Sequence, residues 1–180
     1  MQLHEAVAGR LEEIDRVLIE TQEAGMRIIN KSGPLAGPAD RDHCLQYIAA
    51  IPLIFGRLTA ADYEDDIAGD VRIDQLRARM QVSENEQFTR DYMDPDKRAI
   101  SNALQVFFTD GTSTPRIEIE YPIGHPRRRA EGVPVLLEKF RENLATRFDS
   151  KRVRQIIAAC QDRDALEAMP VPDFMELWVE

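Results

Sequence analysis

The chain has 180 residues and a formal net charge of −9, and so acidic a protein is poorly suited to the phosphates of nucleic acid. No apolar run approaches the roughly 18 residues of a membrane span, and the first residues lack the basic and apolar regions of a signal peptide. The 2 cysteines show no CxxC spacing and the 3 histidines show no clustered spacing, which argues against a disulfide framework and a metal site. We therefore expect a cytoplasmic protein without nucleic-acid, membrane or metal partners.

The first half of the chain shows one strand pattern among several helical patterns. Residues 14–21 are rich in β-branched side chains and form a short run, which predicts a strand. Residues 1–11 have the apolar spacing of the end of a helix that belongs to a longer protein. Further helices are predicted at residues 23–30, 40–55, 59–67 and 71–80. The arginines of the last helix are expected on a solvent-exposed face: Arg72, Arg77 and Arg79.

The stretch from residue 32 to residue 65 holds a polar cluster directly before a long apolar run. Asp40 is expected to cap a helix that starts there, so that the cluster would lie at the positive helix end, which favours an anion. His43 and Tyr47 are four residues apart and would share one helical face. Together with Arg41 they form a candidate wall for an anionic substrate. The alternative is that Tyr47 is a core tyrosine whose hydroxyl bonds to the backbone.

The clearest pattern of the second half is a pair of alternating segments. Residues 99–108 and 116–121 alternate apolar with polar side chains, and Asp110-Gly111 between them offers the positive φ of a tight turn. This predicts a β-hairpin with one apolar face, as in a sheet that helices cover on one side. Residues 81–97 are expected to be irregular, apart from a short helix near residues 86–92.

Three consecutive arginines follow the hairpin in this acidic chain. Arg127, Arg128 and Arg129 come after His125 in a loop punctuated by glycine and proline. The guanidinium group is a planar fork that binds carboxylates through two hydrogen bonds, so the run is a candidate carboxylate-binding site. The alternative is a solvated turn, or ion pairs with another domain.

The last third of the chain is predicted to be helical. Amphipathic spacing predicts helices at residues 133–148 and 149–160, and residues 174–178 form a short apolar tail that must dock on other apolar surface. The predicted fold class is α+β, a two-layer α/β sandwich with a small, mainly antiparallel sheet covered by helices, followed by a C-terminal helical tail. Because exposed apolar segments favour self-association, we expect a homo-oligomer.

Four stretches in order carry a resemblance to a known family: GPLAGPADRDHCLQYIAAIPLIFGRLTAADYEDD, MDPDKRAISNAL, FTDGT with EYPIGHPRRR, and MPVPDFMELWV. The chain resembles, over essentially its whole length, the MmgE/PrpD family of 2-methylcitrate dehydratases, which includes cis-aconitate decarboxylase and iminodisuccinate epimerase. Enzymes of that family are much longer, with a large helical domain before this region. The resemblance implies that residues 1–145 form the smaller α+β (lid) domain. Residues 146–180 would be a helical tail that packs on the missing helical domain.

The same resemblance implies a chemistry. It is the dehydration of 2-methylcitrate to 2-methyl-cis-aconitate in propionate breakdown, without a metal or organic cofactor. The active site of the related decarboxylase lies between two domains, and the tyrosine that its smaller domain supplies matches Tyr47. The main acid–base residues belong to the helical domain, so we expect the chain alone to be inactive. Roles for Arg41 and His43 rest on their own chemistry only. Two alternatives stay open: a related activity on citrate or cis-aconitate, and a non-catalytic interaction domain.

Overall fold

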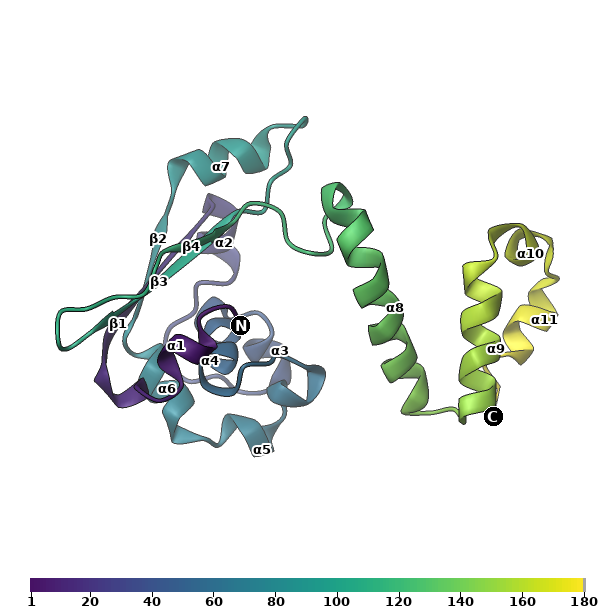
Figure 1. The fold of residues 1–180 in the computed structure, drawn as a ribbon, viewed down its shortest axis with the longest axis horizontal. Helices are drawn as coiled ribbons and strands as arrows, with labels where there is room; N and C mark the ends of the chain where they lie inside the picture. Colours follow the sequence, from purple (N-terminus) through teal and green to yellow (C-terminus); the bar gives the residue numbers. More distant parts are fainter. Residues whose placement is uncertain (180) are drawn as a thin grey trace. The chain divides into compact units, whose positions relative to one another are not determined.

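The structure is a computed structural model, and it describes residues 1–179. Helices and strands are interspersed up to residue 122, and helices make up the ordered elements after it (Figure 1). The elements in chain order are α1 (His4–Val7), β1 (Ile14–Thr21), α2 (Glu23–Ile28), α3 (Pro38–Arg41), α4 (Leu45–Phe55), α5 (Asp65–Ala68), α6 (Val71–Arg77), β2 (Met80–Glu84), α7 (Glu86–Met93), β3 (Asn102–Phe108), β4 (Ile117–Ile119), α8 (Arg129–Ala145), α9 (Ser150–Gln161), α10 (Arg163–Ala168) and α11 (Val171–Glu176). Short 3₁₀ turns lie at Leu11–Glu13, Ala60–Tyr63 and Pro126–Arg128.

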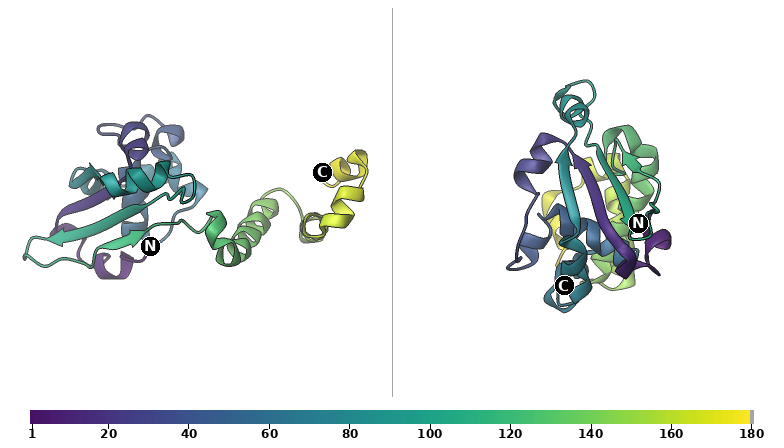
Figure 2. Two further views of the ribbon diagram at one scale, coloured as in Figure 1. Left: turned by 90° about the horizontal axis from the view of Figure 1, so that it is seen from above. Right: turned by 90° about the vertical axis from the view of Figure 1, so that its left-hand side faces the viewer.

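The strands form one four-stranded sheet in the order β2-β1-β3-β4 (Figures 1 and 2). Strand β1 is parallel to β2 and antiparallel to β3, and β3 is antiparallel to β4. The predicted β-hairpin is confirmed, because β3 pairs antiparallel with β4. Gly111 in their connection has a φ of 84°, which a residue without a Cβ atom adopts readily. The predicted α+β class with a small, mainly antiparallel sheet is confirmed as well.

The apolar helix α4 supplies much of the core of the first 122 residues. Its side chains Tyr47, Ala50 and Ile51 are buried in the same cluster as Val17 of β1 and Val106 of β3. The helix ends at Gly56, whose φ of 72° is the left-handed conformation typical of a glycine C-cap. The dense apolar run of the sequence is therefore a buried helix packed with the sheet, as the predicted two-layer arrangement requires.

Two predicted boundaries are wrong. The helix expected from Asp40 is broken, because α3 ends at Arg41 and α4 starts after an extended Cys44. Tyr47 lies in α4 but His43 precedes it, so the two do not share one helical face. The segment after α6 was expected to be irregular, whereas residues 80–84 form strand β2 beside β1. A parallel edge strand gains its hydrogen bonds from a partner far away in sequence, which local periodicity does not record.

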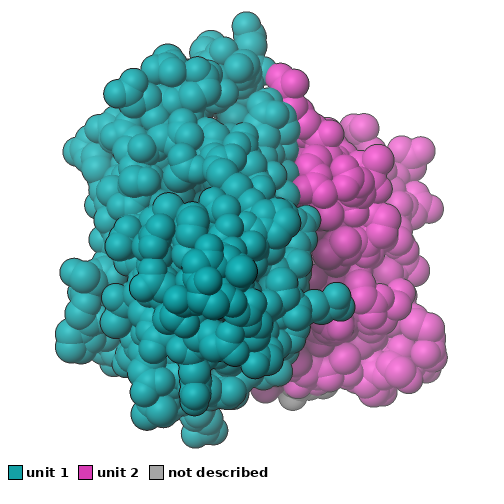
Figure 3. All heavy atoms as spheres, turned by 60° about the vertical axis from the view of Figure 1, so that its left-hand side comes forward, with its two compact units in different colours: residues 1–122 teal, residues 123–180 magenta. Residues whose placement is uncertain are grey.

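The chain divides into two compact units, residues 1–122 (unit 1) and residues 123–180 (unit 2), which Figure 3 shows in two colours. Unit 2 has its own small core, with Leu144, Val153 and Ile156 at its centre. The tail residue Trp178 packs there, and its ring centroid lies 6.4 Å from that of Phe140. The lid and tail boundary at residues 145 and 146 stays a prediction about the longer family members. Within this chain α8 belongs with α9.

Candidate functional site

The hydroxyl of Tyr47 lies inside unit 1. The residue is only 2% exposed, and its hydroxyl donates a hydrogen bond of 2.7 Å to the backbone carbonyl of Asp62. Its ring stacks on that of Tyr63 with the centroids 6.1 Å apart. Burial raises the pKa of Tyr47, and the nearby charge of Arg41 opposes that rise. At neutral pH the hydroxyl is therefore protonated, and it can donate a hydrogen bond but cannot serve as a base.

The Asp62 carbonyl is held in place by a capping box at the start of the 3₁₀ turn Ala60–Tyr63. Oδ2 of Asp62 accepts hydrogen bonds from the backbone N–H (2.7 Å) and the hydroxyl (2.8 Å) of Thr59. Its Oδ1 lies 3.0 Å from Nη2 of Arg57. Burial alone would raise the pKa of this carboxyl, but the bonds from Thr59 and the charge of Arg57 lower it overall. The fully buried carboxylate thus fixes the turn to which Tyr47 is bonded.

Arg41 is buried beside the same turn. Its guanidinium donates to the backbone carbonyl of Tyr63 at 2.6 Å and to Oδ1 of Asp65 at 2.7 Å. These bonds join α3 to the start of α5, so in this structure the side chain stabilises the packing of unit 1. An anion that approached it would compete with an exposed carboxylate, since the Asp65 side chain is largely solvent-accessible.

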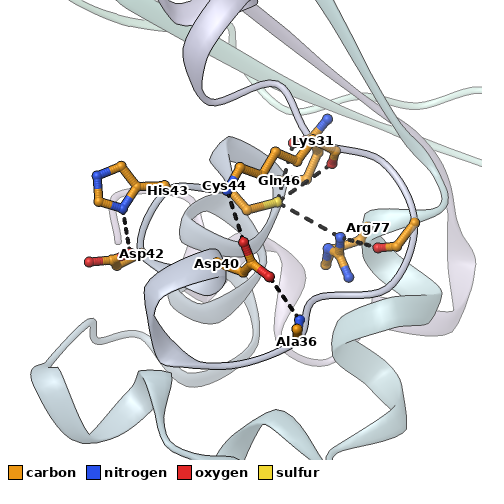
Figure 4. Close-up of polar contacts among 9 residues, drawn as sticks. Lys31, Ala36, Asp40, Asp42, His43, Cys44, Gln46 and Arg77 are labelled. Carbon is orange, nitrogen blue, oxygen red and sulfur yellow. Dashed lines mark hydrogen bonds and ion pairs between the residues drawn. The ribbon is translucent and has the colours of Figure 1, made fainter.

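His43 lies in the exposed link between α3 and α4. Its Nδ1 is 2.5 Å from Oδ1 of the neighbouring Asp42, and both side chains are open to solvent (Figure 4). Asp40 does not cap α4. Its carboxylate accepts from the backbone N–H of Ala36 and from Lys31 instead, and these bonds, in that order, lower its pKa. Of the predicted polar wall, Tyr47 and Arg41 thus meet around the turn at residues 60–63, while His43 is a surface residue.

The arginine run belongs to unit 2. Nδ1 of His125 accepts a hydrogen bond from the backbone N–H of Arg127 at 3.2 Å, which caps the 3₁₀ turn Pro126–Arg128. Arg128 is paired with Glu131 through a bond of 2.6 Å from Nη2, and this pairing lowers the pKa of Glu131. Arg127 and Arg129 have exposed side chains. The predicted site residues thus divide between unit 1 and unit 2.

One residue near Tyr47 follows from a local signal and another was misjudged from the sequence. The Thr59-x-x-Asp62 spacing predicts an N-cap with a first-turn acid, and the structure contains that capping box. Arg77 was expected on a solvent-exposed face, which is wrong, because its side chain is 9% exposed. Arg79 likewise donates to backbone carbonyls, including that of Ile14. No local signal distinguishes these arginines from Arg72, which is exposed.

The described residues contain no group of three or more His, Cys, Asp or Glu side chains that could hold a metal ion. None of the helices between residues 1 and 179 is long and apolar enough to cross a membrane.

Comparison with known proteins places this fold in a family. The family model for the MmgE/PrpD C-terminal domain matches residues 1–163 of the chain. The chain belongs to the MmgE/PrpD family. It is 56% identical over 181 residues to the 2-methylcitrate dehydratase of Cupriavidus necator, with 99% of this chain covered. It is 54% identical to that of Salmonella typhimurium over 93% of the chain, and 50% identical to the mitochondrial 2-methylcitrate dehydratase of Yarrowia lipolytica over the whole chain.

The match covers only part of each relative. The chain spans 37% of the Cupriavidus necator protein and 35% of the other two. The family is therefore shown for this C-terminal region, as the sequence motifs predict.

Proposed function

We propose that this chain is the C-terminal, lid-forming part of a 2-methylcitrate dehydratase, which converts 2-methylcitrate to 2-methyl-cis-aconitate in propionate catabolism. The observation that carries the proposal is the identity of 50–56% to relatives so named, across nearly all of the chain. The partner that completes the enzyme in this proposal is the helical domain that the resemblance implies for the preceding region. We further propose a cytoplasmic homo-oligomer that needs no cofactor.

The reaction removes a proton beside a carboxylate and expels hydroxide from the neighbouring carbon. It needs a base, a hydrogen-bond donor for the leaving oxygen, and cations that hold the carboxylates of the substrate. In this proposal Tyr47 is the donor, because burial keeps its hydroxyl protonated. The hydroxyl has one proton, which goes to the Asp62 carbonyl here. Donation to the substrate therefore requires an exchange of acceptors. The base comes from the helical region.

The proposal assigns candidate cations in each unit. In unit 2, Arg127 and Arg129 have exposed side chains just before and at the start of α8, and a guanidinium fork can bind a carboxylate through two hydrogen bonds. In unit 1, Arg41 contributes positive charge near Tyr47, and His43 is a candidate substrate contact at the surface before α4. His125 shapes the loop of the arginine run through its bond to the Arg127 backbone. Arg128 can join only by exchanging Glu131 for a substrate carboxylate.

A chimeric enzyme tests the proposed function. The N-terminal two-thirds of the Cupriavidus necator protein, joined to this chain in place of its own C-terminal third, should dehydrate 2-methylcitrate. The 180-residue chain alone should not, because it lacks the acid–base residues that the proposal assigns to the helical region. The measurement is the absorbance of the unsaturated tricarboxylate. Turnover by the isolated chain contradicts the division of roles. A folded chimera active only on citrate supports the related activity, and a folded, inactive chimera supports a non-catalytic domain.

The arginine run gives a second prediction for the chimera. Arg127→Ala and Arg129→Ala should raise KM by roughly 10- to 100-fold with little change in kcat, because a carboxylate clamp binds ground and transition states alike. Arg141→Ala is the matched control, since Arg141 lies further along α8 and pairs with Glu138. Steady-state kinetics on the variants decides the matter. If KM stays unchanged in all variants of the run, including Arg128→Ala, the run is a solvated turn.

A further inference from the structure

Arg41 keeps one edge of its guanidinium group open, although the residue is buried. Its Nη1 donates to the backbone carbonyl of Tyr63 at 2.6 Å, and its Nη2 donates to Oδ1 of Asp65 at 2.7 Å. Within residues 1–179 its Nε has no hydrogen-bond partner, and the side-chain nitrogens that are enclosed without a partner there belong to Arg77 and Trp178. The Nε of Arg41 therefore reaches the surface as an unused donor.

The ion pair between Arg41 and Asp65 uses only part of this edge. It joins one carboxylate oxygen, Oδ1, to one nitrogen, Nη2, and the Asp65 side chain is 86% exposed. A pair with so exposed a partner gains little, because water competes for the carboxylate. A carboxylate that placed its two oxygens on Nε and Nη2 would form two parallel hydrogen bonds, which is the stronger geometry. Asp65 thus holds this edge weakly.

The same edge lies beside the hydroxyl to which the proposed function assigns a catalytic role. Tyr47 and Arg41 donate to consecutive backbone carbonyls, those of Asp62 and Tyr63. Burial raises the pKa of Tyr47, and the positive charge of Arg41 opposes that rise, as a cation close to the hydroxyl does. A carboxylate on the Nε and Nη2 edge of Arg41 would therefore bind close to the Tyr47 hydroxyl.

We propose that Asp65 is an internal competitor for the substrate. Its carboxylate holds Nη2 of Arg41 in the free protein and gives way to a substrate carboxylate, which binds Nε and Nη2 together. The bond from Nη1 to the Tyr63 carbonyl stays and keeps the guanidinium group in place. The inference rests on the proposed function for the substrate class, a tricarboxylate. Because Asp65 must leave first, the affinity for the substrate is reduced according to the fraction of molecules in which the pair is formed.

The first test is the kinetics of the chimeric dehydratase. Asp65→Asn keeps the shape of the side chain but removes its charge, and it should lower KM for 2-methylcitrate by about 2- to 5-fold, the competition expected from an exposed ion pair. The value of kcat should stay within about two-fold, because the competitor is already displaced in the substrate complex. Asp66→Asn is the matched control, since it removes the same charge from the next residue of α5 and leaves Asp65 in place. It should change KM by less than about 1.5-fold, because solvent and salt screen exposed charges.

The second test needs no catalytic activity. In the isolated, isotope-labelled chain, tricarballylate should shift the Nε–H signal of Arg41 saturably, with a Kd on the order of 1–10 mM. This tricarboxylate has no hydroxyl group to lose. Asp65→Asn should tighten its binding by the same factor as it lowers KM, and Asp66→Asn should not. The neutral triamide of tricarballylate should cause no shift, and sodium chloride at equal ionic strength corrects for general salt effects.

The two tests separate this inference from the proposed function. If the chimera is inactive, the proposed function fails and the titration alone decides the role of Asp65. An Arg41 signal that tricarballylate does not shift would overturn the inference. So would a KM or Kd that Asp65→Asn leaves unchanged or raises, or an equal improvement in Asp66→Asn, which would reduce the effect to general electrostatics.

Discussion

Replacement of Asp62 by alanine should lower the free energy of unfolding of unit 1 by about 2–4 kcal/mol, because two hydrogen bonds from Thr59 to a buried, charged acceptor are lost. The carboxylate is fully buried and accepts two hydrogen bonds from Thr59 while facing Arg57. Without it the backbone N–H of Thr59 loses its partner. The turn that carries the carbonyl acceptor for Tyr47 then loses its cap.

Tyrosine and tryptophan signals separate the two units in this measurement. All 4 tyrosines lie before residue 123 and the single tryptophan is Trp178, so near-ultraviolet circular dichroism of tyrosine follows unit 1 during urea unfolding. Trp178 fluorescence follows unit 2. Asp66→Ala is the control, because that side chain is exposed on α5, and it should change stability by less than about 0.5 kcal/mol. An equally small effect of Asp62→Ala would show that the capping box contributes little.

The same carboxylate predicts a pH dependence. The pKa of Asp62 in the folded chain lies below its ordinary value of 3.8, so the unfolded chain binds this proton more readily than the folded one. The stabilisation is therefore complete above the ordinary pKa and is lost as the pH falls through the lower, folded pKa. The stability difference between the native chain and Asp62→Asn should shrink in acid, when urea unfolding at about pH 7 is compared with about pH 3. A difference that does not change with pH would contradict this linkage.

The elements that the sequence predicts well are those with local signals. Strand β1 covers the same residues as the predicted β-branched run. The helix predicted at residues 149–160 is α9, and the Asp149 side chain caps it by accepting from the N–H groups of Lys151 and Arg152. The missed elements depend on distant partners. Residues 80–84 become a strand because β1 offers parallel hydrogen bonds to them. The helix predicted from Asp40 is interrupted at Cys44, whose backbone is extended, and the Asp40 carboxylate bonds to Ala36 and Lys31 rather than capping α4.

The candidate site shows the same limit. The sequence singles out Tyr47 as a hydroxyl within an apolar run, but its acceptor, the Asp62 carbonyl, is 15 residues away along the chain. Arg77 is buried because the loop after α2 folds over the end of α6. The helical spacing in the sequence does not record that contact, and it therefore does not distinguish Arg77 from the exposed Arg72. Resemblance to a family identifies matching positions, whereas hydrogen-bond partners come only from the three-dimensional structure.

Replacement of Tyr47 by phenylalanine should lower kcat of the chimeric dehydratase by about 100- to 1,000-fold and change KM little. That is the range expected when one hydrogen-bond donor to a developing charge is lost. The change removes the hydroxyl but keeps the ring that stacks on Tyr63. It also leaves the Asp62 carbonyl without its donor, so the isolated chain should lose about 1–2 kcal/mol of stability. Steady-state kinetics and urea unfolding measure the two effects separately.

A purely structural role of Tyr47 makes a different prediction. The stability loss would then be present, but kcat per folded enzyme would stay near that of the unmodified chimera. Tyr63→Phe is the matched control, since it removes a hydroxyl from the stacked neighbour and should leave kcat within about two-fold if only Tyr47 donates to the substrate. Because burial raises the pKa of Tyr47, activity should show no loss that is attributable to its ionisation between about pH 6 and 9. A normal kcat in Tyr47→Phe would assign the hydroxyl to the core of unit 1 alone.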